Sequence, residues 1–308
     1  MIAEVIVDIA SGETDRIYDY LCGDETQAGS RVRVPFGGKV VPGFVMRLKE
    51  TSDCPTEKLK RAFPCPDERP ALNTECLALA GKLAARYRVP MALCLRLFLP
   101  SEMRAGKVRE LKKNYASLLV PLSEMKLSRT AKNQLGAAEY LEKNGKTECG
   151  FLNGLFPGGV SALEKKGYVS VAKEQILRDP YKGMESASAE HVLTADQRAA
   201  VEKIKSDGRT VQLLHGVTGS GKTEIYLTLI AECLKEGKSS IFLVPEISLT
   251  PQMLSQLRAR FGRNAAIMHS GLSAGEKFDE WWRMRSGEAK IAIGARSAVF
   301  SPLENLGV

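Results

Sequence analysis

The pattern of apolar and polar residues changes several times along the 308 residues of the chain. Residues 1–70 contain short apolar stretches that are separated by turns rich in glycine. This pattern predicts strands at residues 2–9, 31–34 and 43–48, with a turn at residues 35–38. Short strands of this kind predict a small barrel or a curled sheet.

Helical spacing replaces the strand pattern over residues 71–99. Asn73 or Thr74 can cap the first helix. Val89-Pro90 separates it from the next helix, because the residue before a proline disfavours helical geometry. A run of lysines and arginines follows between residues 104 and 113, and we interpret it as a solvated connector.

A further helical pattern comes next. Ser128 is a candidate cap for a helix that ends at Asn144-Gly145. A short helix is expected at residues 160–166 and a strand at residues 168–171. Two helices followed by paired strands fit a winged-helix module. Such modules bind DNA or serve as protein-contact and spacer domains, and the sequence leaves both uses open.

Strands and helices alternate beyond a polar linker at residues 179–189. The expected strands are residues 211–215, 240–244, 264–268 and 289–293, and the expected helices are about residues 222–236, 250–261 and 274–286. This alternation predicts a parallel sheet with helical crossovers. Ligands bind at the carboxyl ends of the strands in such sheets, so the loops after these strands form the candidate site.

The loop after the first of these strands contains a glycine-rich sequence, Gly216-Val217-Thr218-Gly219-Ser220-Gly221-Lys222-Thr223. It fits G-x-x-x-x-G-K-[ST], the phosphate-binding P-loop. Glycines let several backbone N–H groups converge on one anion, and the helix N-terminus adds its positive end. Lys222 would reach the β- and γ-phosphates of a nucleotide, and the Thr223 hydroxyl would bind Mg²⁺. A glycine-rich turn with an incidental lysine is the plainer alternative.

Gln197 lies ahead of the P-loop strand, in the stretch of residues 193–197. Its amide offers a donor and an acceptor to an adenine edge, which would select ATP over GTP. The same stretch fits a capping box, with Thr194 as the cap and Gln197 at the third helical position. The two interpretations are compatible.

The composition of the chain indicates which partners and which cellular location to expect. The net charge of +8 favours a polyanionic partner such as nucleic acid, although many basic enzymes bind none. The seven cysteines are scattered without a C-x-x-C pair. We therefore expect neither zinc ligands nor a disulfide framework in this chain, and a location in the reducing cytoplasm. The chain shows no basic leader and no apolar run long enough for a bilayer, so no membrane partner is expected.

Three more loops follow the later strands, at residues 245–252, 269–273 and 294–300. Each combines hydroxyl groups and turns with an occasional charge, which suits contacts to the phosphates of a single nucleic-acid strand. Singly, each also fits an ordinary connecting loop.

Together with the P-loop, these stretches closely resemble the helicase motifs of the PriA family, the superfamily 2 DNA helicases of bacterial replication restart. Residues 16–20 and 29–37 are similar to the 3′-end DNA-binding domain of that family. The resemblance implies a multidomain α/β chain. Its domains would be a β-rich 3′-end-binding domain at 1–105, a winged helix with linker at 106–185, and an incomplete P-loop (RecA-like) helicase lobe at 186–308.

The resemblance also implies roles for single residues. Tyr18, Asp19 and Lys60 would form a pocket for the base and the hydroxyl at a DNA 3′ end. Asp19 can accept a hydrogen bond from a 3′-hydroxyl and would repel a 3′-phosphate. Ser270 and Arg296 are candidates for DNA-backbone contacts. The plainer alternatives are an ordinary strand aromatic for Tyr18 and a solvated charge for Lys60.

An ATP-dependent 3′→5′ helicase that restarts replication forks is the function this resemblance implies, with ATP and Mg²⁺ as cofactors. Its partners would be stalled forks, D-loops and single-stranded DNA, together with primosome proteins and single-stranded DNA-binding protein, and the chain would be a monomer. The family's Asp-Glu-Glu-His motif, second helicase lobe, arginine finger and zinc-binding cysteines are absent from these residues. We therefore expect an N-terminal fragment that binds DNA, binds nucleotide weakly and hydrolyses ATP little, with zinc only in the missing C-terminal part.

Two other interpretations stay open at this point. A different P-loop enzyme, such as a nucleotide kinase, would not need the β-rich N-terminal half. A DNA fork-structure binding protein with a vestigial nucleotide site would need that half but not the catalytic use of Lys222.

Overall fold

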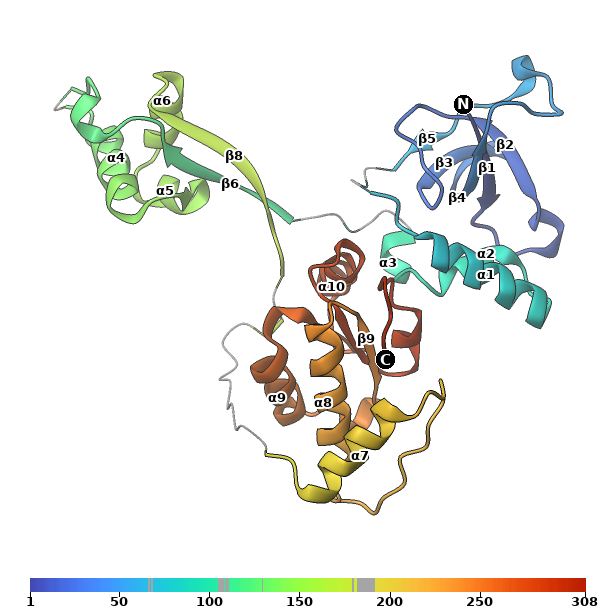
Figure 1. Cartoon of the computed structure of the whole chain (residues 1–308). Helices are drawn as coiled ribbons and strands as arrows, with labels where there is room; N and C mark the ends of the chain where they lie inside the picture. Colours follow the sequence, from blue (N-terminus) through green and yellow to red (C-terminus); the bar gives the residue numbers. More distant parts are fainter. Residues whose placement is uncertain are drawn as a thin grey trace. The chain divides into compact units, whose positions relative to one another are not determined.

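The computed structural model describes residues 1–65, 67, 69–104, 108, 111–128, 130–178, 180–181 and 192–308, apart from the side chains of Glu102 and Gln175. The chain forms two compact units (Figure 1). The first comprises Met1–Arg109 and Pro180–Val308, and the second comprises Glu110–Asp179. The predicted boundaries at residues 105 and 185 remain predictions.

The N-terminal part is a five-stranded antiparallel sheet in the order β2-β1-β4-β3-β5. Its strands are β1 (Ile2–Val7), β2 (Ile17–Leu21), β3 (Arg31–Phe36), β4 (Lys39–Lys49) and β5 (Phe63–Pro64). The turn between β3 and β4 is tighter than predicted. Gly37 and Gly38 make it alone, with φ of 55° and 77°, and Pro35 and Phe36 belong to β3. Positive φ at both central positions is the geometry of a type I′ hairpin, which glycine adopts without strain.

This sheet curls, as the short strands predict. The end of edge strand β2 pairs with the segment ahead of β5, at the other edge of the sheet. Leu21 N–H donates to Lys60 O at 2.9 Å, and Ala62 N–H donates to Leu21 O at 2.8 Å. A bulge at Met46 of β4, opposite Glu4 and Val5 of β1, increases the local twist. The curl brings Lys60 beside the strand that carries Tyr18 and Asp19.

Helices α1 (Thr74–Tyr87), α2 (Met91–Arg96) and α3 (Ser101–Arg104) follow the sheet. Asn73 caps α1, because its side chain accepts a hydrogen bond from Cys76 N–H at 2.8 Å. The alternative cap, Thr74, is the first residue of the helix. Pro90 stands at the start of α2, as the predicted break requires.

The helices share one hydrophobic core with the curled sheet and with helix α10 (Ala274–Ser286). Phe44 of the sheet, Leu95 of α2 and Trp281 of α10 are buried in it. The indole Nε1 of Trp281 donates to Phe98 O at 2.7 Å. The N-terminal helices and the C-terminal part of the chain therefore belong to one packed unit.

The C-terminal part is a parallel sheet in the order β10-β11-β9. Its strands are β9 (Ser240–Leu243), β10 (Ala265–Met268) and β11 (Ile291–Gly294), and its other helices are α7 (Ala195–Ser206), α8 (Lys222–Lys235) and α9 (Pro251–Phe261). These strands and helices lie within a few residues of their predicted positions, and the parallel direction is confirmed. None of the helices in the described part of the chain has the length and apolar character needed to span a bilayer.

The predicted strand at residues 211–215 is wrong. These residues form no strand, and the side chains of Val211 and Leu213 are exposed. A strand needs a neighbour with unpaired backbone groups. The outer edge of β9 does not offer them, because it pairs with residues 305–308. Ser239 N–H donates to Asn305 O at 2.9 Å, and Ile241 N–H donates to Val308 O at 2.9 Å. Residues 211–215 therefore run to the P-loop as irregular chain.

The second unit packs three helices against an antiparallel sheet in the order β7-β6-β8. Its elements are β6 (Leu111–Leu118), α4 (Lys132–Asn144), β7 (Thr147–Glu148), α5 (Cys149–Leu155), α6 (Gly159–Lys165) and β8 (Val169–Ile176). Helix α5 was not expected, because two glycines interrupt its apolar pattern. The assignment of this unit as a winged helix stays a prediction.

Three sequence expectations in and near this unit are corrected. Lys112 and Lys113 are residues of β6 and not of a solvated connector. The cap of α4 is Ala131, since the Ser128 hydroxyl is bonded to that of Thr130 at 2.8 Å. Tyr181, expected in a polar linker, is buried in the core of the parallel sheet, whereas residues 179 and 182–189 of that linker lie outside the described residues.

Candidate functional site: a P-loop and two candidate DNA-contact regions

The P-loop runs into the N-terminus of α8 (Figure 1). Gly219 and Gly221 both have positive φ, 83° and 79°, and Gly221 is the N-cap of the helix. The amide groups in the first turn of a helix have no acceptor within the helix. The loop therefore presents free N–H donors and the positive helix end at one place, as an anion site requires.

Lys222 holds the loop closed on itself. Its ammonium Nζ donates to Gly216 O at 2.7 Å and to Val217 O at 2.8 Å. The ammonium is therefore bonded to the backbone of the first two residues of the loop. Thr223, the next residue, has an exposed side chain on the first turn of α8.

Gln197 contacts the P-loop directly. Its Nε2 donates to Ser220 O at 3.2 Å, and its Oε1 accepts from Thr194 N–H at 3.0 Å. The predicted capping box is confirmed, since the Thr194 side chain also accepts from Gln197 N–H. Among the described residues, one N–H and one lone pair of the Gln197 amide have no partner, which is the set that an adenine edge needs. An ion pair between Lys205 and Glu232 at 3.1 Å joins α7 to α8.

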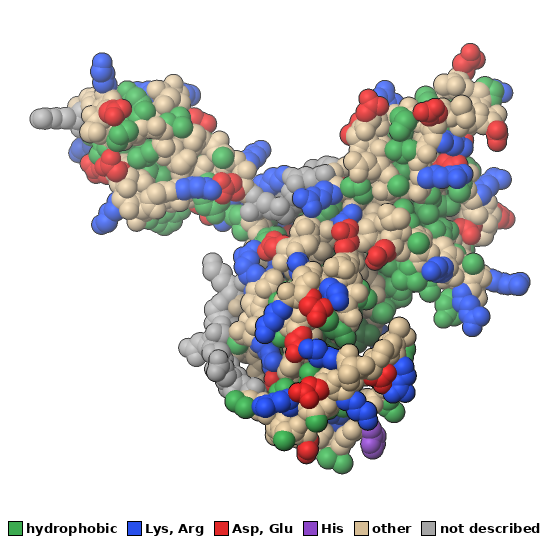
Figure 2. All heavy atoms as spheres, in the orientation of Figure 1, with side chains coloured by type: hydrophobic (Ala, Val, Ile, Leu, Met, Phe, Trp, Pro, Cys, Tyr) green, Lys and Arg blue, Asp and Glu red, His purple; other side chains and the backbone are tan. Residues whose placement is uncertain are grey.

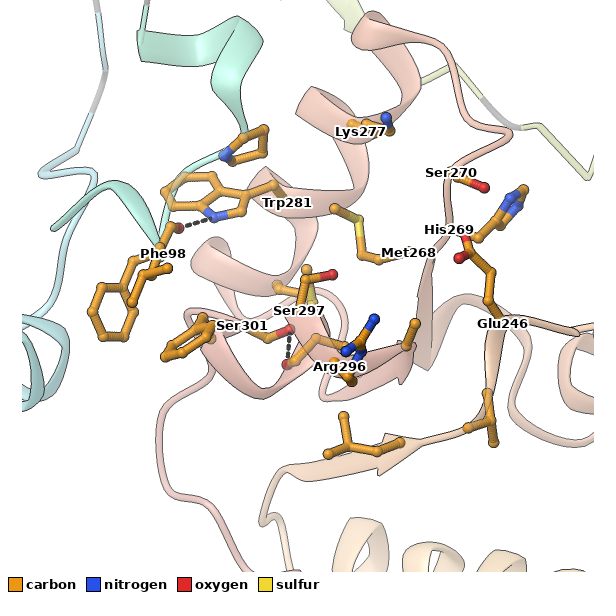
Figure 3. A pocket seen from close by; sticks show the side chains of 18 of the residues that line it. Phe98, Glu246, Met268, His269, Ser270, Lys277, Trp281, Arg296, Ser297 and Ser301 are labelled. Carbon is orange, nitrogen blue, oxygen red and sulfur yellow. Dashed lines mark hydrogen bonds between the residues drawn. The ribbon is translucent and has the colours of Figure 1, made fainter. Parts of the chain in front are cut away.

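The other three loops line a cavity of about 990 Å³ in the first unit (Figure 3). Glu246 comes from the loop after β9, His269 and Ser270 from the loop after β10, and Arg296 from the loop after β11. Ser270 and Arg296, both predicted to contact DNA, thus face one space. The apolar wall of the cavity comes from Phe98 and from helix α10.

Glu246 is the acidic member of this group. Hydrogen bonding from Ser270 holds the pKa of the Glu246 carboxyl below its usual value, and the nearby His269 and Arg296 act in the same direction. Glu246 is therefore ionised at neutral pH and faces the cationic side chain of Arg296 across the cavity. The cavity thus holds both anion-binding donors and an anion of the protein itself.

Asp19 lies in a network of charges on one face of the curled sheet. Lys49 Nζ is 2.7 Å from Asp19 Oδ2 and 3.1 Å from Glu4 Oε1. Arg47 binds the same Glu4 through two nitrogens. The Ser52 hydroxyl donates to Asp19 Oδ2.

The charges in this network reinforce one another. The pKa of the Lys49 ammonium is raised mainly by its hydrogen bond to Asp19, and next by its hydrogen bond to Glu4. The hydrogen bond from Arg47 lowers the pKa of Glu4, although burial opposes the shift. The lowered pKa keeps the Glu4 carboxyl ionised at neutral pH, and Lys49 lies between the side chains of Glu4 and Asp19.

Tyr18 and Asp19 point to opposite faces of β2, because neighbouring residues of a strand alternate. The Tyr18 ring packs edge-on against Phe36, with ring centroids 5.0 Å apart, and its hydroxyl accepts from Arg16 Nε at 2.9 Å. Lys60 is exposed beside the end of β2. A pocket that used Tyr18, Asp19 and Lys60 together would therefore have to lie at the outer edge of β2, where side chains from both faces can meet.

Lys49, Ser52 and Glu4 were missed by sequence reasoning. The sequence contained a partial signal for Lys49. It lies two residues from Arg47, so the two cationic side chains share one face of β4. The pairing of β1 with both β2 and β4 decides which face that is, and pairing is a tertiary property.

Net charge does not locate a DNA site. On the face shown in Figure 2, Lys and Arg side chains are interspersed with Asp and Glu. The excess of positive charge predicted a polyanionic partner, but no continuous basic stripe marks that face. The loops and the network described above are therefore better guides than total charge.

Two families match the chain. Residues 4–100 match the family described as 3′DNA-binding domain (3′BD), and residues 194–307 match DEAD/DEAH box helicase. These matches cover the curled sheet with its helices and the P-loop sheet. They agree with a DNA-binding part followed by a part from a family of ATP-dependent helicases.

Three similar proteins share one name. The chain is 35% identical to the replication restart protein PriA of Bacillus subtilis, over 99% of this chain and 48% of that protein. It is 32% identical to that of Haemophilus influenzae, over 95% of this chain and 42% of that protein. A shorter match, over 48% of this chain, is 47% identical to PriA of Synechocystis. The chain spans about half the length of the first two relatives.

The domain matches, their order and the length of the aligned segments all point to one family. The chain is a homologue of the PriA replication restart proteins, with a 3′ DNA-binding domain followed by a DEAD/DEAH box helicase domain.

Proposed function

We propose that this chain is the nucleotide- and DNA-binding part of an ATP-dependent 3′→5′ DNA helicase that initiates the restart of stalled replication forks. The observation that carries the proposal is the P-loop at the start of α8, with Lys222 and Gln197 both bonded to its backbone. The relatives are about twice as long as this chain, so unwinding is proposed for the whole protein. Nucleotide and DNA binding are proposed for these 308 residues.

In this proposal the P-loop amides of residues 216–223 hold the phosphates of ATP. Lys222 turns from the loop carbonyls to the β- and γ-phosphates. The Thr223 hydroxyl would be a ligand of Mg²⁺, which neutralises phosphate charge when it is bound. Gln197 selects adenine with its remaining N–H and lone pair.

DNA contacts are proposed at two places. Asp19 accepts a hydrogen bond from the 3′-hydroxyl of a nascent strand, with Tyr18 and Lys60 at the same edge of the sheet. Ser270 and Arg296 contact the DNA backbone from the loops of the parallel sheet. Asp19 gives the proposal its specificity, because a carboxylate accepts from a hydroxyl and repels a phosphate.

The remaining parts of the proposal come from the family. The domains are 1–105, 106–185 and 186–308, and the middle one is a winged helix. Stalled forks, D-loops, primosome proteins and single-stranded DNA-binding protein are the proposed partners of a cytoplasmic monomer. Zinc is proposed only for parts of the protein outside this chain.

Nucleotide binding is tested by titrating a fluorescent ATP analogue with Mg²⁺ into the chain and its Lys222→Ala variant. We expect the variant to bind at least about tenfold more weakly, since a contact between an ammonium and a phosphate is lost. Lys235→Ala is the matched control, because Lys235 is exposed at the other end of α8 and should leave affinity unchanged. Equal affinity for wild type and Lys222→Ala would overturn the nucleotide site.

The enzymatic part is tested in the whole protein. DNA-stimulated ATP hydrolysis that Lys222→Ala abolishes is the expected result. DNA binding without such hydrolysis would instead favour a fork-binding protein with a vestigial nucleotide site.

A further inference from the structure

We propose that Lys49 is a positioning residue for the 3′ end of DNA, which it serves by holding the carboxylate of Asp19 in place. The inference rests on the proposed role of Asp19 and adds a residue that no sequence motif identified. Lys49 lies at the end of β4, with an ammonium 2.7 Å from Asp19 Oδ2.

The first argument is the geometry of the Asp19 carboxylate. Lys49 and Ser52 both bond to the same oxygen, Oδ2. Among the described residues, no hydrogen bond engages the other oxygen, Oδ1. The carboxylate is thus fixed through one oxygen while the second stays available, and the side chain keeps 16% of its surface exposed. A hydroxyl group that donates to Oδ1 would meet an acceptor whose orientation is already set.

The second argument is the neighbouring carboxylate. Glu4 is directly opposite Asp19 in the β1–β2 register and is buried. Two carboxylates facing each other across a strand pair repel, and burial strengthens the repulsion. Lys49 bridges the two, with 3.1 Å to Glu4 Oε1. Without this cation, Asp19 would turn away from Glu4 and lose its fixed orientation.

A comparison with Arg47 explains why Lys49 is the cation proposed to hold Asp19. Both cations lie on β4 and both bind Glu4. Within the described part of the chain, no hydrogen bond or ion pair joins Arg47 to Asp19, and the Arg47 side chain is 71% exposed, whereas that of Lys49 is 29% exposed. Removing either one takes a single positive charge from the same carboxylate network, but only the loss of Lys49 removes the cation bonded to Asp19 and leaves it with the Ser52 hydroxyl alone.

The test measures binding of fluorescent single strands that end in a 3′-hydroxyl or in a 3′-deoxy group. The two strands have equal charge, so the affinity ratio reports the hydrogen bond to the hydroxyl and not electrostatic attraction. We expect wild type to favour the hydroxyl about tenfold, as for a hydrogen bond to a charged acceptor. Lys49→Met should reduce the ratio to below about twofold, while Lys49→Arg and the control Arg47→Met keep it.

The outcomes separate this inference from the function on which it rests. Wild type with no preference for the hydroxyl would overturn both. A preference that Asp19→Asn abolishes and Lys49→Met retains would overturn the role of Lys49 alone. Loss of the preference in Arg47→Met as well would also overturn it, because any loss of charge would then suffice. Thermal unfolding checks the fold of each variant, and Lys49→Gln replaces Lys49→Met if the latter does not fold.

Discussion

At the scale of single residues, the P-loop depends on one close approach. Gly221 has φ of 79°, and a Cβ atom at this position would lie 2.1 Å from Gln197 Nε2. The glycine therefore does two things, since it supplies the left-handed backbone and leaves room for the amide that contacts the loop. The sequence pattern identified the glycine, but only the structure shows that it touches Gln197.

Gly221→Ala should therefore impair nucleotide binding. The alanine must push Gln197 away from Ser220 and also adopt a strained backbone, at a cost of about 1–2 kcal/mol for the left-handed conformation alone. We expect the affinity for a fluorescent ATP analogue to fall at least about tenfold.

Gly237→Ala is the matched control for this change. Gly237 has φ of 75°, and a Cβ atom added there would have open space around it. An alanine at this position would therefore have the strained backbone without the collision. Its substitution should lower the thermal midpoint while affinity stays at the wild-type value. A similar loss of affinity in both variants would show that strain, and not the contact with Gln197, causes the effect.

At the scale of elements, one charge network connects strands β2, β1 and β4. Glu4 on the central strand of these three is bound by Arg47 and Lys49 from β4, and Lys49 continues to Asp19 on β2. Glu4 is 4% exposed, so its charge is tolerated only because its partners are present.

The stability of the sheet should depend on pH through Glu4. Hydrogen bonding to Arg47 lowers the pKa of Glu4 in the folded state. The contribution of Glu4 to stability is therefore complete above the unfolded value, about 4.5, and is lost as pH falls towards the lower folded value. Glu4→Gln should lower the thermal midpoint near pH 7 and flatten its decline below about pH 4.5.

Thermal unfolding followed by circular dichroism between pH 3 and pH 7 measures this dependence. Glu13→Gln serves as the control, since Glu13 is exposed and lies outside the network. Its curve should follow that of the wild type. A Glu4→Gln curve that declines as steeply as the wild type would contradict the assignment.

At the scale of the whole molecule, the chain consists of two units with separate cores. Leu152 is buried in the core of the second unit, and none of the described residues of the first unit belongs to that core. Damage to one core should therefore leave the other unit folded.

Leu152→Ala tests this independence. Removing a fully buried leucine costs about 2–5 kcal/mol, a large share of the stability of a small unit. Hydrogen exchange measured by mass spectrometry should accelerate across residues 111–178 and stay unchanged in β9, β10 and β11. Leu155→Ala on the same helix is the control, because Leu155 is 51% exposed and should change little. Faster exchange in both units would show that they unfold together.

Local sequence determined much of this protein. The period of apolar residues placed α8, α9, α10 and the strands of the parallel sheet, and the spacing of glycines identified the P-loop. The capping box at Thr194 and Gln197 was also readable, because a cap involves residues only three positions apart.

Only the tertiary structure decided the rest. Residues 211–215 have the composition of a strand, yet a segment near residue 306 occupies the edge of β9. Tyr181 reads as part of a polar linker, yet it is buried beneath the parallel sheet. Lys49 was missed by the sequence analysis, yet strand pairing brings it to Asp19 and Glu4. In each case the outcome depends on a partner that is far away in the sequence, and neither propensity nor periodicity carries information about that partner.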